Sequence, residues 1–236
     1  AKYEELKKKP IKTKKRKIEL LEEANYYSEE VRRIISENYG SGMHLLYSNP
    51  ILTNIEISNN YIGGGGYSSG IFLEHSHSIL TNVLIIENES KGMHLLNSNP
   101  IITNFDISRN NNNGLFLEYS NPTFSNGIIN NNTASNGGGI HLYISNPVLS
   151  NVTISYNISD LGAGISLNYS DPTLINVNVI NNIATEAGGG ISILESIPRI
   201  TNTIIWGNTP ESIYLSDNSG DSGYPIIIYS DIEGGW

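Results

Sequence analysis

Residues 42–50 read GMHLLYSNP, and residues 92–100 read GMHLLNSNP. Looser copies of this stretch begin at five more glycines: Gly70, Gly114, Gly139, Gly164 and Gly190. Successive copies are 22 to 28 residues apart, and each holds two or three short runs of alternating apolar and polar residues. A unit this short cannot bury its own apolar side chains, so seven copies in a row predict a repeat architecture.

Two asparagine positions recur in all seven copies. The first column is Asn54, Asn82, Asn104, Asn126, Asn151, Asn176 and Asn202. The second column lies six residues later, at Asn60, Asn88, Asn110, Asn132, Asn157, Asn182 and Asn208. Stacked copies would bring identical asparagines into contact, so we expect both columns to form internal ladders that satisfy buried turn backbone.

The repeats predict an all-β parallel solenoid of about seven coils. One coil buries about five apolar side chains, each contributing ~1.5–3 kcal/mol. Ordering its more than twenty residues costs more than that, at ~1–2 kcal/mol per residue for the backbone. A single coil therefore cannot fold alone, whereas stacked coils share one core and pair their backbones at ~4.8 Å.

The first forty residues differ from the rest. Nine of the fourteen Lys and Arg lie within residues 1–17, and residues 18–38 read as an amphipathic helix that stops before Gly40. Four of its apolar residues could cover the first coil: Leu21, Val31, Ile34 and Ile35. We therefore expect a basic N-terminal segment with a capping helix over residues 1–40, and β-helix repeats over residues 41–236.

The C-terminal run Ile226-Ile227-Ile228 predicts a last strand without an obvious cap. An unpaired solenoid end recruits other chains, so we expect end-to-end self-association through the C-terminal coil. The net charge of −9 argues against nucleic acid as a partner. No apolar run approaches 18 residues, so no membrane span is expected.

The repeats resemble the right-handed, single-stranded parallel β-helix family of pectate-lyase-like proteins. They are most similar to polymorphic outer-membrane-protein repeats, which carry GGA[IL] and FxxN motifs. The matching stretches are Gly138-Gly139-Ile140, Gly162-Ala163-Gly164-Ile165, Gly189-Gly190-Ile191, Ile154-Ser155-Tyr156-Asn157 and Val179-Ile180-Asn181-Asn182. Ile or Val replaces the aromatic residue of FxxN. The resemblance covers residues 40–236, and it implies a secreted or cell-surface protein of bacterial type.

An outward-facing column two residues after each glycine is the main candidate for ligand binding. Its members are His44, Phe72, His94, Phe116, His141, Ser166 and Ser192, and Glu74 and Glu118 lie two positions further on. Rings at ~4.8 Å steps could stack on sugars while the glutamates accept hydroxyl hydrogen bonds. The alternative interpretation is that the rings stack on one another or pack under a loop.

Catalytic candidates are few. Glu56 and Asp106 would stand two coils apart, about 9.6 Å by coil spacing, which fits an inverting carboxylate pair. Arg109 is the nearest base, but Leu84 lies between the two acids. The acidic signatures of related polysaccharide-active enzymes are missing, so we lean towards a protein that is not an enzyme and needs no cofactor. His75 and His77 could hold a metal ion only with a third ligand.

Three functions stay open at this stage. The first is a non-enzymatic surface solenoid that serves as adhesin, stalk or glycan-binding module. The second is a polysaccharide-active lyase or hydrolase, and the third is an engineered or truncated solenoid scaffold. A Thr/Ser column is similar to ice-binding arrays, but Ile175 interrupts it and no Thr-x-Thr pattern recurs. The column is Thr53, Thr81, Thr103, Ser125, Ser150 and Thr201.

Overall fold

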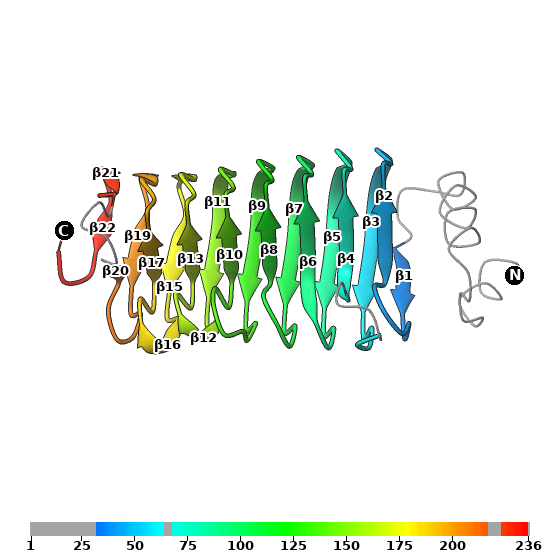
Figure 1. Cartoon of the computed structure of the whole chain (residues 1–236), viewed down its shortest axis with the longest axis horizontal. Helices are drawn as coiled ribbons and strands as arrows, with labels where there is room; N and C mark the ends of the chain where they lie inside the picture. The colour runs from blue at the N-terminus through cyan, green and yellow to red at the C-terminus, as the bar shows by residue number, and fades with distance from the viewer. Residues whose placement is uncertain (1–31, 64–67, 217–222, 236) are drawn as a thin grey trace, which may run out of the picture.

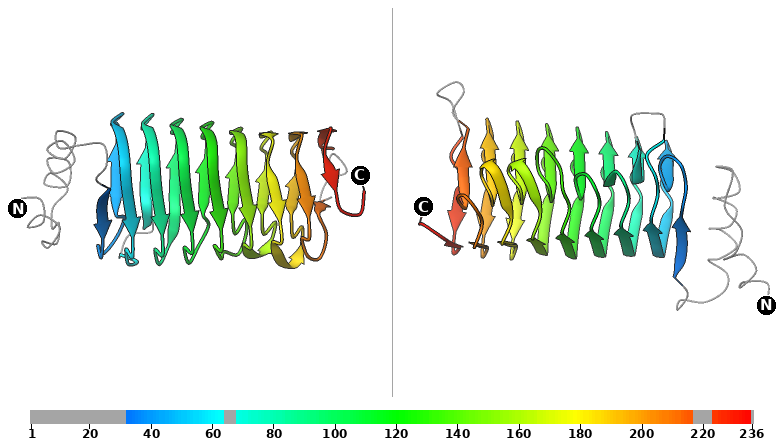
Figure 2. Two further views of the ribbon diagram at one scale, coloured as in Figure 1. Left: turned by 180° about the vertical axis from the view of Figure 1, so that it is seen from behind. Right: turned by 90° about the horizontal axis from the view of Figure 1, so that it is seen from below.

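The computed structural model describes residues 32–63, 68–216 and 223–235. These residues form a rod of stacked coils, in which the strands run across the rod and the chain advances from one end to the other (Figures 1 and 2). Strands of successive coils pair in parallel, residue against residue. The predicted parallel solenoid is therefore confirmed.

One eight-stranded sheet, here called sheet I, takes one strand from each coil. Its strands are β2 (Met43–Leu46), β4 (Ser69–Glu74), β6 (Lys91–Leu96), β8 (Leu115–Glu118), β10 (Ile140–Tyr143), β13 (Ile165–Asn168), β17 (Ile191–Leu194) and β20 (Ile213–Leu215). The described residues thus form eight coils, one more than the glycines indicate. The eighth was missed because Ser212 occupies the glycine position, while Ile213 stands opposite Ile191.

A twelve-stranded sheet forms the other two sides of the coil. Its first strands are β1 (Arg33–Ser36), β3 (Ile51–Ser58), β5 (Ile79–Ile86), β7 (Ile101–Ser108), β9 (Thr123–Asn130) and β11 (Val148–Ser155). In later coils each long strand is divided, giving β14 (Thr173–Ile175), β15 (Asn178–Ile180), β18 (Arg199–Thr201), β19 (Ile204–Trp206), β21 (Ile226–Ile228) and β22 (Asp231–Ile232). A separate pair, β12 (Ile158–Leu161) and β16 (Ile183–Ala187), lies on the connections that return to sheet I.

Each long strand bends at the first asparagine column. Asn54 has a φ of 56°, and every member of the column lies in the same left-handed region. Asparagine adopts this conformation more readily than most residues with a side chain. The bend divides the sheet into face II, which precedes the asparagine (51–53 in the first coil), and face III, which follows it (55–58).

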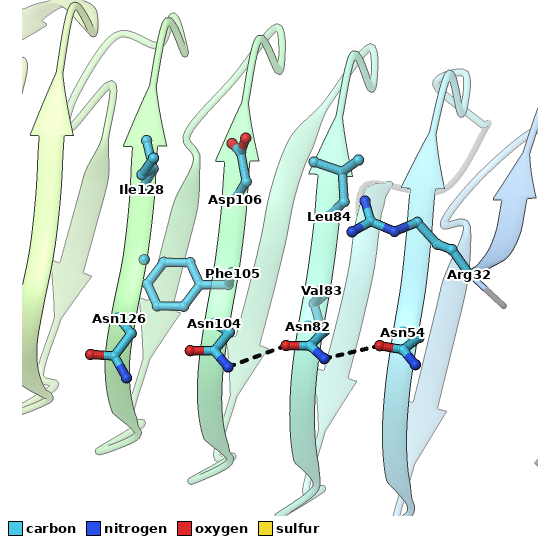
Figure 3. Close-up of a pocket in the computed structure, with 11 residues that line it drawn as sticks. Arg32, Asn54, Asn82, Val83, Leu84, Asn104, Phe105, Asp106, Asn126 and Ile128 are labelled. Carbon is cyan, nitrogen blue, oxygen red and sulfur yellow. Dashed lines mark hydrogen bonds between the residues drawn. The ribbon is translucent and has the colours of Figure 1, made fainter. Parts of the chain in front are cut away.

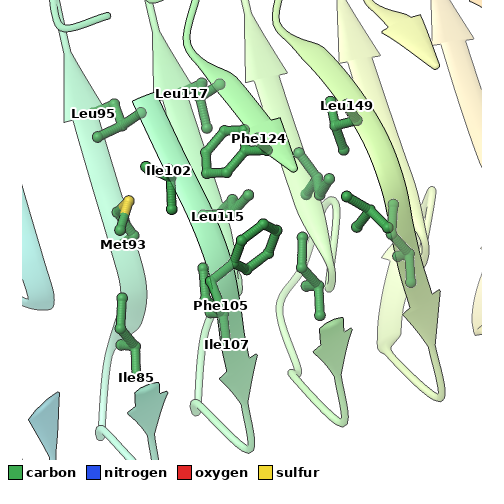
Figure 4. Packing of buried hydrophobic residues seen from close by; sticks show 14 of the residues in the cluster. Ile85, Met93, Leu95, Ile102, Phe105, Ile107, Leu115, Leu117, Phe124 and Leu149 are labelled. Carbon is green, nitrogen blue, oxygen red and sulfur yellow. The ribbon is translucent and has the colours of Figure 1, made fainter. Parts of the chain in front are cut away.

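The core is one continuous apolar cluster along the rod axis. Met93 and Leu95 of sheet I meet Ile102 and Ile107 of β7, and all four are fully buried (Figure 4). Each buried side chain of this size contributes ~1.5–3 kcal/mol. Because every coil adds to the same cluster, stacking provides the stability that a single coil lacks.

The second asparagine column forms the predicted internal ladder. Asn132 is fully buried, and its Nδ2 donates to Oδ1 of Asn157 at 3.1 Å and to the carbonyl oxygen of Ile107 at 3.0 Å. Its own Oδ1 accepts from the backbone N–H and from Nδ2 of Asn110, both at 3.0 Å. The same pattern starts already at Asn38, one step before the first predicted copy.

The first asparagine column is not internal, which corrects the prediction. Nδ2 of Asn82 donates to Oδ1 of Asn54 at 3.0 Å, and Asn104 donates to Asn82 at 3.2 Å, but these bonds lie on the surface. A left-handed residue on the outside of a bend directs its side chain to solvent. The column is therefore a ladder of exposed amides.

A third ladder, which the sequence analysis missed, uses the serine of the Ser-Asn-Pro turns. Oγ of Ser120 accepts the backbone N–H of Ser98 at 3.0 Å and donates to the carbonyl oxygen of Glu118 at 2.8 Å. The serines of this column are buried from Ser76 to Ser196. A buried hydroxyl can donate and accept at once, so it satisfies a turn that has no room for a larger side chain.

The prediction of a helix over residues 18–38 is wrong for residues 33–36. Residues 33–36 are strand β1, which pairs with β3 and buries Ile35 in the core. Residues 18–31 lie outside the described residues. The expected C-terminal strand is confirmed as β21 and β22, and end-to-end association stays a prediction.

The two asparagine ladders should differ in their effect on stability. Asn132→Ala should lower the free energy of unfolding by ~3 kcal/mol or more, because several buried polar groups lose a partner at ~1–3 kcal/mol each. Asn126→Gly, which keeps the left-handed backbone, should cost less than ~1 kcal/mol. Denaturant unfolding of both variants measures the difference, and equal losses would contradict this account.

Candidate functional site

The predicted outward column forms a stack of rings along sheet I. Ring centroids are 4.6 Å apart between His44 and Phe72, 4.7 Å between Phe72 and His94, and 4.9 Å between His94 and Phe116. His141 adds a fifth ring, 5.1 Å from Phe116. Strand register places these residues directly opposite one another, so the coil repeat sets the stacking distance.

The expectation that this column is an exposed binding stripe is wrong at its centre. Phe72 and His94 are each only 2% exposed. The ring of His94 lies between two phenyl rings, so neither of its faces can take a sugar ring. The alternative interpretation, in which the rings stack on one another, describes the structure.

The glutamates expected to accept sugar hydroxyls contact the histidines instead. Nε2 of His94 lies 2.7 Å from Oε2 of Glu118, and Nε2 of His44 lies 3.2 Å from Oε2 of Glu74. An ionised carboxylate can only accept, so a neutral ring in this contact donates its Nε2–H. The ring stack and its glutamates thus form one polar and aromatic cluster on the outer side of sheet I.

Burial controls the charge of this cluster. Burial lowers the pKa of His94 to about 3, and the positive charge of Lys91 acts in the same direction. Burial also lowers the pKa of His141 to about 4. The pKa of Lys91 is lowered and that of Glu118 is raised, again mainly by burial. Both histidines are therefore neutral at pH 7.

His75 and His77 take part in packing at the corner that follows sheet I. The ring of His75 stacks on Tyr47 with centroids 4.8 Å apart. Nδ1 of His77 accepts the backbone N–H of Asn99 at 3.0 Å. Among the described residues, no group of three or more His, Cys, Asp or Glu could hold a metal ion.

The same corner carries exposed tyrosines, here called the tyrosine corner: Tyr47, Tyr119 and Tyr169. Their φ angles are 49°, 52° and 51°, so all three are left-handed. A bulky residue pays ~1–2 kcal/mol for this conformation, while Asn97 at the equivalent position suits it better. His75 and Ile144 occupy equivalent positions with the same left-handed backbone, so the turn imposes this conformation. The exposed tyrosine rings nevertheless make this corner a second candidate surface.

A shallow groove lies over the bend between faces II and III (Figure 3). Its volume is about 740 Å³, within the range of ligand sites. We call it the asparagine groove, since the exposed amide ladder runs along it. Its lining residues are Arg32, Asn54, Asn82, Val83, Leu84, Asn104, Phe105, Asp106, Asn126, Gly127 and Ile128.

Asp106 is the one carboxylate among the residues that line the groove. It stands in register between Leu84 and Ile128, two aliphatic neighbours (Figure 3). Its Oδ1 is buried and has no hydrogen-bond partner in the described part of the chain. Such a group costs ~1–3 kcal/mol, and nearly all buried polar atoms in folded proteins avoid that cost. The other oxygen, Oδ2, also has no partner but is not buried, so it is the atom of Asp106 that can accept a hydrogen bond from a ligand.

The predicted acid–base set is only partly assembled. Glu56 stands two coils from Asp106 with Leu84 between them, as predicted, but it does not line the groove. Arg109 turns away to the next corner, where its Nε donates to Oε1 of Glu87 at 2.9 Å. Asp106 thus lacks the base that the catalytic interpretation requires.

Phe105 and Gly127 shape one wall of the groove and were missed by the sequence analysis. Both occupy an inward column that holds Val83 and Val152 in neighbouring coils. A Cβ on Gly127 would lie 2.2 Å from the Phe105 ring, so the glycine makes room for that ring. A phenylalanine beside a glycine in an otherwise aliphatic column is a signal that could have revealed the pair.

The amino-acid sequence matches the model of a protein family whose fold is this architecture. Residues 18–143, more than half of the chain, match the model described as right handed beta helix region. The chain belongs to the right-handed β-helix family. The coils of this β-helix continue beyond the matched range to β22. The narrower likeness to polymorphic outer-membrane-protein repeats stays a prediction, and no curated protein sequence matches the chain.

One solved structure shows the same fold at low identity, and a second resembles the chain less closely. Pectate lyase Pel9A is 13% identical, with a TM-score of 0.51 over 76% of this chain and 56% of that one. The A-module of the Azotobacter vinelandii mannuronan C-5 epimerase AlgE4 is 11% identical, with a TM-score of 0.43 over 84% of this chain and 76% of that one. The β-helix spans about half the length of the lyase. No helix in its described residues is long and apolar enough to cross a membrane.

The buried histidines predict an acid-sensitive fold. His94 and His141 take up protons near pH 6.5 when unfolded, but only near pH 3 to 4 when folded. Stability from this source is therefore complete above pH 6.5 and falls as the pH drops, by ~1.4 kcal/mol per pH unit for each histidine. Urea unfolding between pH 7 and 5 measures this slope.

A double variant provides the control. His94→Phe with Glu118→Leu introduces residue types that neighbouring coils already hold in these columns, Phe72 and Leu96. It removes His94, which steepens the slope, and also Glu118, whose raised pKa opposes it, so the slope should fall by at most half. An unchanged slope would show that the acid sensitivity has another source.

Proposed function

We propose that this β-helix is a non-enzymatic, polysaccharide-binding solenoid whose ligand lies along the asparagine groove. The observation that carries the proposal is the carboxylate of Asp106, which lines the groove and makes no hydrogen bond within the described structure. Its Oδ1 is buried, so Oδ2 is the oxygen that a ligand hydroxyl can reach. A hydrogen bond to this carboxylate would offset part of the cost of leaving it without a partner.

The remaining lining residues suit a hydroxyl-rich polymer. The amides of Asn82, Asn104 and Asn126 each offer donors and an acceptor to solvent. Leu84 and Ile128 present aliphatic surface on either side of Asp106, which suits the C–H face of a sugar ring. The row repeats along the rod at ~4.8 Å per coil, so it favours an extended chain over a compact ligand.

The charge of the protein favours neutral glycans over polyuronates. The chain carries a net charge of −9, and Asp106 can only accept hydrogen bonds when ionised. Arg32 is the one cation among the lining residues. A glycan with a carboxylate on every sugar would place like charges close to Asp106, which costs binding energy.

An extracellular or cell-surface location belongs to the same proposal. Eight coils at ~4.8 Å spacing make a rod of ~34 Å between the first and last strand of sheet I. A rigid rod of this kind can hold a binding groove away from a surface, as an adhesin or stalk does. Immunodetection on intact cells of the source organism would test the location.

A polysaccharide-active enzyme is the second candidate. Lys91, His94, Glu118 and His141 lie together on sheet I with shifted pKa values, a pattern that active sites also show. Burial is the largest cause of each of these shifts, and structural clusters show such shifts as well as active sites, so binding is the preferred function. New reducing ends or unsaturated sugars after incubation with glycans would favour the enzyme.

Asp106→Leu should weaken glycan binding and raise the free energy of unfolding. Leucine already stands at position 84 of the same column, so it fits the site. Removing a buried oxygen without a partner should raise the free energy of unfolding by ~1 kcal/mol. Affinity for the best glycan found on an array should fall at least tenfold, measured by titration calorimetry.

Two control variants locate the ligand. Glu56→Leu makes the same change in the same column outside the groove and should leave affinity unchanged. Tyr119→Ala should also leave it unchanged, because the tyrosine corner lies on another edge of the coil. If only Tyr119→Ala abolished binding, the groove would be the wrong site. If the chain bound no glycan, the proposed function would be wrong.

A further inference from the structure

Face II has an unusual composition for a soluble surface. Over the first five coils its outward positions hold only Ile, Val, Thr and Ser, in two columns. The columns are Ile51, Ile79, Ile101, Thr123 and Val148, and Thr53, Thr81, Thr103, Ser125 and Ser150. Soluble surfaces are about one quarter to one third charged, yet none of these ten positions is. The first column is well exposed, with Ile51 at 64% and Ile101 at 51%.

Strand pairing makes this surface a regular grid. Members of each column stand opposite one another in an unbroken parallel register from β3 to β11. Neighbouring rows are ~4.8 Å apart along the rod, and the two columns are ~6.6 Å apart, two residues along a strand. Water molecules on the faces of hexagonal ice repeat on a rectangular grid of about this size.

The side chains of the grid are also stiff. β-Branched residues hold few χ1 rotamers, and eight of the ten positions are Ile, Val or Thr. Two of the hydroxyls also hold one another, because Oγ of Ser125 donates to Oγ1 of Thr103 at 3.2 Å. Because these methyl and hydroxyl groups are already fixed, they lose little conformational entropy when the surface binds to an ordered lattice such as ice.

Other occupants fit this surface less well. A glycan would find fewer hydrogen-bond partners here than in the asparagine groove, because the ten positions include no amide and no carboxylate. The patch measures only ~24 by ~10 Å, or about 240 Å². A stable protein interface buries ~800 Å² on each partner, so this patch is too small for one. A crystal face sets no such minimum, because a growing lattice surrounds the molecules that adsorb to it.

We propose that face II of the first five coils, from Ile51 to Ser150, is an ice-binding surface. The sequence alone does not predict this function, because no Thr-x-Thr pattern recurs. The structure shows instead that an exposed β-branched residue accompanies each Thr or Ser two positions earlier on the same face. The row is therefore Ile-x-Thr in three coils, followed by Thr-x-Ser and Val-x-Ser. This proposal does not depend on the asparagine groove.

Uptake into slowly growing ice tests the proposal with the full chain. Labelled wild type is expected in the ice at several times the fraction found for an unrelated labelled protein. Thr103→Lys, at the centre of the grid, should reduce uptake to the level of that protein. Thr153→Lys is the matched control, because it adds the same charge on face III of β11 and should leave uptake unchanged. Circular dichroism and melting curves confirm that each variant folds, and Ile101→Lys replaces Thr103→Lys if that variant does not.

Each opposite outcome overturns the proposal. Exclusion of the wild type from ice would do so, and so would equal uptake of wild type and Thr103→Lys. If the wild type formed dimers that Ile101→Lys dissociated, and the wild type did not enter ice, face II would be an interface with a second copy of the chain. Retention on crystalline cellulose or chitin, again without ice uptake, would assign it to a polysaccharide surface. Glycan binding in the groove could persist in all of these cases.

Discussion

The vertical register of the coils depends on the buried amide ladder. Asn132 bonds to Asn110 on one side and Asn157 on the other, and it also satisfies a backbone carbonyl. A slip of one residue would leave several buried polar groups without partners and would turn the apolar side chains out of the core. The amide ladder and the apolar core therefore select the same register. Every surface column described here follows from it.

One register produces surfaces with different chemistry, because each side of the coil repeats its own residue types. Sheet I carries rings and charges that stack and pair with one another, which closes most of that surface to a ligand. The bend between faces II and III exposes amides and leaves Asp106 with an oxygen that lacks a partner. Face II of the first five coils presents uncharged side chains, most of them β-branched. The groove and face II can therefore act independently, since they share no side chain.

The repeat made much of this predictable. The glycine and asparagine columns predict the coil, its parallel pairing and the internal ladder. The outward column predicts an exposed binding stripe, and the stack of rings that the structure shows is the alternative interpretation. Other expectations were wrong for identifiable reasons. The eighth coil was missed because Ser212 replaces the glycine, and strand β1 was mistaken for helix because Ile34 and Ile35 fit both patterns. Arg109 was assigned to Asp106 from its position in the sequence, whereas its side chain reaches Glu87 on the neighbouring coil.

The sequence alone determined which residues stand above one another, because a period of 22 to 28 residues with fixed turn chemistry permits only one alignment of the copies. Only the tertiary structure decided which columns are exposed. Asn54 and Asn60 repeat equally well, yet one lies on the outside of a bend and the other inside the coil. Exposure depends on left-handed corners and on packing between coils, and neither is encoded in the period of a repeat. The candidate sites followed from exposure, so they became visible only in the folded chain.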